Sequence, residues 1–226
     1  MQLRRILLYS TLLTTFSFPA IAQDSSSSST PKHTKKPSTP KESTLDSGSI
    51  ANNVYRNKTL AMSCKIPEGW VLRTEEMNSS AENSAESKET PDPAQLPASS
   101  VGAKALLAAF SRPPEARAED VNSSILIAAE PTASYPGLKE AAQYFGPLTE
   151  VAKAQGFTMD EDPYEIAVGT KTLVRGDFHK DVGTRVMHQS TLALLSHGYA
   201  VSITIIAGTD DEVEDLIGSL SFGPGK

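Results

Sequence analysis

The sequence predicts an α+β domain in which helices pack on an antiparallel β-sheet. Three observations lead to this fold class. Apolar strand-like segments separated by turn residues run through 171–207, apolar residues recur at helical spacing through 137–157, and a helix start signal stands at Thr209. Strands joined by short turns pair antiparallel, and amphipathic helices bury their apolar faces against such a sheet.

The first 22 residues have the pattern of a secretory signal peptide. Arg4 and Arg5 form a positive start, residues 6–18 are apolar, and Ala20-Ile21-Ala22 offers the small residues that precede a cleavage site. The apolar run is too short for a spanning helix, which needs about 20 residues. We therefore expect cleavage before Gln23 and a secreted or periplasmic protein without a transmembrane anchor.

Two further segments have the composition of disordered chain. Residues 23–52 combine a serine run with prolines and lysines, and residues 74–100 are rich in Glu, Ser, Ala and Pro with little periodicity. Neither segment has enough apolar surface to offset the entropy of ordering it. The sequence thus predicts a disordered tether over 23–52 and a single domain over 53–226 with a disordered insertion at about 74–100.

Short strands and one helix are predicted before residue 160. Turn residues or charges bound the strand-like segments 55–57, 63–66, 70–72, 105–110 and 124–129. Residues 137–157 then change to the three- and four-residue spacing of an amphipathic helix, with apolar positions at Leu138, Ala141, Ala142, Phe145, Leu148, Val151 and Ala152. We expect Gly146-Pro147 to kink or break this helix and Gly156 to end it.

The first of two predicted hairpins joins 171–179 to 184–196. Asp181-Val182-Gly183 is predicted to be a three-residue loop, with Lys180 opposite Thr184. A loop of even length would turn Arg175 and Asp177 toward the core, so burial favours the odd register. The face predicted to be buried contains Val174, Phe178, Val186, Ser190, Leu192 and Leu194.

The second predicted hairpin turns at His197-Gly198 and extends the same apolar face. It sets Leu194 opposite Val201 and Leu192 opposite Ile203. A helix then begins with Thr209 as the N-cap and Glu212 completing a capping box. We expect this helix to cover the shared face with Val213, Leu216, Ile217 and Leu220.

The side chains that could carry chemistry do not converge in the predicted register. His179, His188 and His197 match no zinc spacing, and His188 would face the core while His179 points away. Arg175, Asp177, His179 and Arg185 would share the outer face, where Asp177 and Arg185 could form a diagonal ion pair. An acid–base role for the carboxylate beside His179 stays open as an alternative.

The single cysteine and the charge balance limit the function further. Cys64 lies in a strand-like run and is predicted to be a buried core residue rather than a nucleophile. The chain carries 27 acidic against 21 basic residues, and the acidic excess lies in 53–226. Such a domain repels phosphates, which excludes nucleic acid as the expected partner. We predict no catalytic, cofactor-binding or metal-ligating residue and no cofactor.

The order of elements and three short motifs resemble the PsbP/DcrB-like family. The motifs are Tyr55-x-Asn57, Ile66-Pro67-x-Gly69-Trp70 and the closing run from Asp211-Glu212 through Leu216-Ile217 to Phe222. The similarity covers 53–222 without the acidic insertion, which departs from the compact pattern of the family. It implies an α/β/α sandwich and an extracytoplasmic accessory, assembly or binding role, and it carries over no catalytic residue.

These expectations combine into one functional hypothesis with two alternatives. The chain is expected to be a secreted or periplasmic, non-enzymatic accessory or binding protein whose partner is a protein or a cell-envelope component. The first alternative is an extracytoplasmic hydrolase that uses the face of Asp177, His179 and Arg185. The second is a small-lipid carrier, which would need an apolar cavity between the helices and the sheet.

Overall fold

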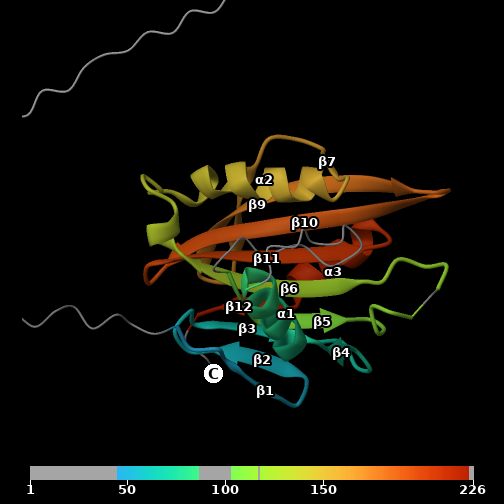
Figure 1. The fold of residues 1–226 in the computed structure, drawn as a ribbon, viewed down its shortest axis with the longest axis horizontal. Helices are drawn as coiled ribbons and strands as arrows, with labels where there is room; N and C mark the ends of the chain where they lie inside the picture. The colour runs from blue at the N-terminus through green and yellow to red at the C-terminus, as the bar shows by residue number, and fades with distance from the viewer. Residues whose placement is uncertain (1–44, 87–102, 117, 224–226) are drawn as a thin grey trace, which may run out of the picture. The chain divides into compact units, whose positions relative to one another are not determined.

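The computed structural model describes residues 45–86, 103–116 and 118–223 (Figure 1). They form antiparallel β-sheets with a few helices packed on them, which confirms the predicted fold class. The predicted signal peptide and most of the predicted tether lie outside these residues. Among the helices of the described part, none combines the length and the apolar content that crossing a bilayer requires.

Among the described residues, eight strands form the larger sheet. Their order is β4 (Val71–Leu72), β5 (Lys104–Phe110), β6 (Ser124–Pro131), β11 (Tyr199–Ala207), β10 (Arg185–Ser196) and β9 (Lys171–Val182). Two short strands, β7 (Thr158–Met159) and β8 (Tyr164–Val168), pair with different parts of β9. Every pairing is antiparallel, as expected for strands joined by short turns.

A smaller sheet brings the two ends of the described chain together. Its order is β1 (Ser49–Ala51), β2 (Val54–Asn57), β3 (Met62–Lys65) and β12 (Leu220–Phe222). Strand β1 lies inside the predicted tether, so the tether boundary at residue 52 was wrong. Asn52 and Asn53 both have positive φ, 50° and 57°, and asparagine favours this conformation in the tight turns that let a strand fold back.

The helices are α1 (Thr74–Glu86), α2 (Phe145–Ala154) and α3 (Asp210–Gly218), with short 3₁₀ segments η1 (Thr132–Ser134) and η2 (Ala141–Tyr144) before α2. Helix α1 corrects the prediction of disorder from residue 74, because its contacts with β5 are hydrogen bonds that apolar periodicity does not reveal. Residues 87–100 of that predicted insertion lie outside the described part. Gly146 and Pro147 fall in the first turn of α2, where proline is tolerated, so the helix begins there instead of breaking.

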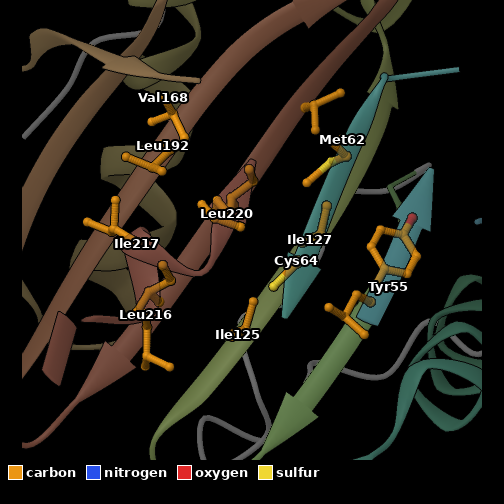
Figure 2. Close-up of a cluster of buried hydrophobic side chains, with 14 of the residues drawn as sticks. Tyr55, Met62, Cys64, Ile125, Ile127, Val168, Leu192, Leu216, Ile217 and Leu220 are labelled. Atoms are coloured by element: carbon orange, nitrogen blue, oxygen red, sulfur yellow. The ribbon is translucent and has the colours of Figure 1, made fainter. Parts of the chain in front are cut away.

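Both faces of the larger sheet are covered. On one face lie α3 and the smaller sheet, and Figure 2 shows Leu192 and Ile127 of the larger sheet with Cys64 and Leu216 from these covering layers. On the other face, Tyr144 and the start of α2 pack on Val174, Ala193 and Ala200. The result is a sandwich in which the larger sheet is the central layer.

The predicted register of the first hairpin was wrong. Val182 lies opposite Arg185, so the loop is the two-residue Gly183-Thr184 and the pairing is the even one. Val174 therefore packs toward α2, whereas Leu192 and Ile203 pack toward α3. The three residues are buried on opposite faces, because a sheet covered on both sides is apolar on both sides and burial cannot select the register.

The second hairpin follows the prediction, and the last helix begins at the predicted N-cap without the predicted capping box, because the Glu212 carboxylate accepts from the N–H of Gly208 and not of Thr209. Leu194 lies opposite Val201 and Leu192 opposite Ile203. The Oγ1 atom of Thr209 accepts a hydrogen bond from the backbone N–H of Glu212 at 3.2 Å, which is the expected N-cap. Helix α3 buries Val213, Leu216 and Ile217, while Leu220 is buried as the first residue of β12.

Candidate functional site: a charged cleft beside α3

The even register gathers charged side chains on the face that α3 covers. Arg175, Asp177 and His179 are two residues apart along β9, so their side chains share one face. His179 lies directly opposite His188 of β10. Beside them, a cleft of about 220 Å³ opens against the first turns of α3. Its lining residues are Asp160, Arg175, Asp177, Phe178, His188, Gln189, Asp210, Val213 and Glu214.

Arg175 is the best-anchored charge in the cleft. Its side chain is 12% exposed, and its guanidinium binds Asp177 Oδ1 at 2.9 Å and Glu214 Oε1 at 2.6 Å. Burial lowers the pKa of Arg175, but the hydrogen bonds to Glu214 and Asp177 outweigh burial and raise its pKa above the ordinary value. Arg175 therefore stays charged; it is held by Asp177 on its own strand and joins β9 to α3 through the carboxylate of Glu214.

Tyr164 of β8 completes the surroundings of Arg175. Its hydroxyl donates to Asp177 Oδ2 at 2.8 Å, and its ring lies 5.9 Å from the guanidinium carbon of Arg175. Burial, and after it the hydrogen bond to Asp177, raises the pKa of Tyr164 to about 12. The hydroxyl thus remains a proton donor toward Asp177 at neutral pH.

Each histidine of this face is bound to a carboxylate from a different segment. His188 Nδ1 lies 2.7 Å from Asp210, the first residue of α3. His179 Nδ1 contacts Asp160, which follows β7. The prediction that His179 and His188 point to opposite sides was therefore wrong, while His197 lies in the turn between β10 and β11 with a φ of 52°.

The predicted acid–base group of Asp177, His179 and Arg185 is not assembled. Asp177 is bound to Arg175 instead. Arg185 pairs with Val182 and therefore lies on the other face of the sheet, where its guanidinium is 3.4 Å from Asp120. Across the part of the chain that the structure describes, no three His, Cys, Asp or Glu side chains are grouped so that they could hold a metal ion. The cleft is therefore a set of ion pairs and hydrogen bonds that position one another.

Sequence reasoning missed Asp210 and Glu214 as members of the site. From the sequence, Asp210 is expected only to favour the start of the last helix through the helix dipole, and no role is predicted for Glu214. The signal that could have found them is their spacing, because residues four apart lie on the same face of a helix. Their exposed fractions of 84% and 57% place both carboxylates at the rim of the cleft.

Cys64 lies where the sequence predicts it, in the core between the sheets. It is fully buried, and burial raises the pKa of its thiol to about 11. Its Sγ lies 3.6 Å from the hydroxyl of Ser219. The thiol is thus a packing group at neutral pH.

The space between α2 and the sheet is occupied by aromatic side chains. Phe145 covers Gly176 so closely that a Cβ at that glycine would lie 2.5 Å from the ring. Tyr144 is 1% exposed and donates its hydroxyl to the buried carboxylate of Glu130 at 2.5 Å, which also receives the hydroxyl of Tyr135. Burial and then the carboxylate raise the pKa of Tyr144. In this region side chains fill the place where the carrier hypothesis expects a cavity.

Comparison with known proteins gives distant similarities. No family model and no curated protein matches the chain. A Pseudomonas aeruginosa protein of unknown function matches at 14% identity over 49% of this chain and 80% of its own, with a TM-score of 0.35. LpqN of Mycobacterium tuberculosis, involved in cell envelope biogenesis, matches at 13% over 71% and 82%, with a TM-score of 0.33. The Saccharomyces cerevisiae Ran-binding protein Mog1p matches at 14% over 78% and 87%, with a TM-score of 0.37. These values assign neither a family nor a function to this chain.

Proposed function

We propose that the chain is a secreted or periplasmic, non-enzymatic accessory or binding protein, and that a protein or cell-envelope component docks at the cleft beside α3. The observation that carries the proposal is the anchoring of Arg175 by Asp177 and Glu214. Polar groups that hold one another in place are preorganised for recognition, because little side-chain freedom is lost when a partner binds.

The rim of the cleft gives this proposal its chemistry. Asp210 and Glu214 extend from α3 into solvent, and Asp160 lines the other side. Four carboxylates against one guanidinium make the cleft acidic when both histidines are neutral. A partner surface that carries basic groups would complement this charge and would associate faster at low ionic strength. Extracytoplasmic placement rests on the signal pattern of residues 1–22, and kinship with the PsbP/DcrB-like family remains part of this proposal.

Site-specific photo-crosslinking in the native host tests the docking site. A crosslinking residue at Asp211, in the exposed first turn of α3, is expected to yield discrete adducts that weaken in a Glu214→Gln variant. The same residue at Glu150, exposed on α2 on the other side of the sheet, is the control. The proposal would be contradicted if both positions gave equal adduct yields, or if the yield at residue 211 were the same with and without Glu214→Gln.

A separate experiment tests the location. Residues 1–30 fused to a reporter enzyme that is active only after export should give activity, and replacing Arg4 and Arg5 by Glu should abolish it. Fusion protein that is made but stays inactive in the cytoplasmic fraction would refute export.

A further inference from the structure

The outer edge of β5 is closed by side chains and not by a full strand. Strand β6 occupies one side of β5, and β4 pairs with the other side only at Phe110 and Ala109. Beyond Leu72 the chain leaves the sheet and continues as α1. The backbone groups of Ala105 and Ala108 that point outward are therefore the ones that a further strand would bind.

Helix α1 and the residue before it bind these groups in the manner of a strand. Asn78 accepts from the N–H of Ala105 at 2.9 Å and donates to its carbonyl at 3.0 Å. Thr74 Oγ1 accepts from the N–H of Ala108 at 3.0 Å, and the N–H of Arg73 donates to the carbonyl of Ala108 at 2.9 Å. A primary amide offers one donor and one acceptor, as a peptide group does, so Asn78 substitutes for a strand residue.

The described side chains at the start of α1, residues 74–79, are exposed or half-buried. None of the residues 74–82 is buried, and Met77 alone packs on the apolar cluster of Ala108, Phe110 and Leu126. The ion pairs of Arg73 with Glu76 and Glu115 have carboxylates that are 64% and 70% exposed, and such surface pairs contribute little. Within residues 73–79, the four hydrogen bonds to Ala105 and Ala108 are therefore the main polar contacts that hold the cover on the edge.

The strand beneath this cover has the composition that pairs with other strands. After Lys104 it reads Ala-Leu-Leu-Ala-Ala-Phe, without a charge, a proline or a glycine. An uncharged apolar edge of this kind pairs with a second strand once it is exposed. Because the same edge exists on every copy, two copies can pair through it antiparallel about a two-fold axis.

We propose that α1 is a removable cover over a strand-pairing site, and that the occupant of this site is β5 of a second copy. This inference goes beyond the proposed function, since β5 and β9 stand near opposite ends of the strand order of the larger sheet. When α1 lifts, the outward groups of Ala105 and Ala108 exchange their side-chain partners for the backbone of the other copy.

The test compares Asn78→Ala with Ser79→Ala in the mature chain from Gln23. Alanine raises helix propensity, so any opening of α1 in Asn78→Ala comes from the lost contacts with Ala105. The hydroxyl of Ser79 donates within the helix, to the carbonyl of Glu75, and among the described residues it makes no hydrogen bond to the edge of β5. We expect amide exchange at Ala105 to be about tenfold faster, or more, in the dilute Asn78→Ala protein than in the control, and its sedimentation coefficient to rise with concentration toward that of a dimer.

Amide exchange at high concentration identifies the surface that associates. If β5 pairs with β5, the amides of Ala105 and Ala108 become protected again as the dimer forms. Unchanged exchange in dilute Asn78→Ala would overturn the cover. Faster exchange without association, or association that leaves these two amides unprotected, would overturn the pairing site. As a second variant, Ala105→Pro in the Asn78→Ala background removes the outward donor and is expected to restore the monomer.

Discussion

Replacing Gly176 by alanine tests how tightly α2 is packed on the sheet. The added Cβ would lie 2.5 Å from Cε1 and 3.1 Å from Cδ1 of Phe145, a ring that is 3% exposed and has little room to move. Overpacking of this kind costs about 1–3 kcal/mol, and the lower entropy of the unfolded chain returns about 0.4–1 kcal/mol. We therefore expect a net loss of about 1–2 kcal/mol in the free energy of unfolding.

Urea unfolding followed by fluorescence of the single tryptophan, Trp70, measures this loss. Gly146→Ala is the matched control, because nothing lies within 4 Å of a Cβ at that position in the first turn of α2; it should leave stability unchanged or raise it by up to about 1 kcal/mol. Phe145→Leu should make Gly176→Ala less costly, since the smaller side chain frees the space. A Gly176→Ala protein as stable as the wild type would refute the packing argument.

Three further predictions concern buried polar and titratable groups. Burial raises the pKa of Tyr55 to about 12, above its ordinary value. The neutral hydroxyl therefore contributes its full stability to the fold below about pH 10, and this contribution is lost as the pH rises toward 12. The free energy of unfolding, measured from pH 9 to 12, should fall less in Tyr55→Phe than in the wild type. Cys64, with a thiol pKa of about 11, should react with a thiol reagent at pH 8 about a hundredfold more slowly than in the urea-unfolded chain, and equal rates would show that the core opens. Tyr144→Phe should cost about 1.5–3 kcal/mol in unfolding free energy, because the Tyr144 hydroxyl donates to the buried carboxylate of Glu130, whereas the same change at the more exposed Tyr164 should cost less.

The hairpins show which parts of the fold the sequence could predict. At His197-Gly198 both residues have positive φ, 52° and 80°, a requirement that specifies a two-residue turn and with it the register of β10 and β11. At Asp181-Val182-Gly183 the glycine is compatible with loops of two or three residues. The choice of register between β9 and β10 then depended on which residues are buried. Burial could not make this choice, because Val174 and Leu192 are both buried, on opposite faces.

The candidate site was predicted only within one strand. Arg175, Asp177 and His179 are two residues apart, so the sequence alone places them on a common face. Glu214 joins them through the way α3 packs on the sheet, which depends on the fit of Val213 and Leu216 in the core. Contacts between elements that are distant in the chain follow from packing, and the residue pattern of a single sequence does not predict them.

The pairing of β12 with β3 bears on the order in which the molecule assembles. Ser219 meets Cys64 across a separation of 155 residues, whereas β9, β10 and β11 meet through turns of two residues. Closing so long a loop is slow compared with zipping a hairpin. The layer that buries Tyr55 and Cys64 should therefore be the last to acquire protection. In a nascent chain β1, β2 and β3 can pair with one another, but the edge of β3 that receives β12 would stay unpaired until residues 220–222 had been synthesised.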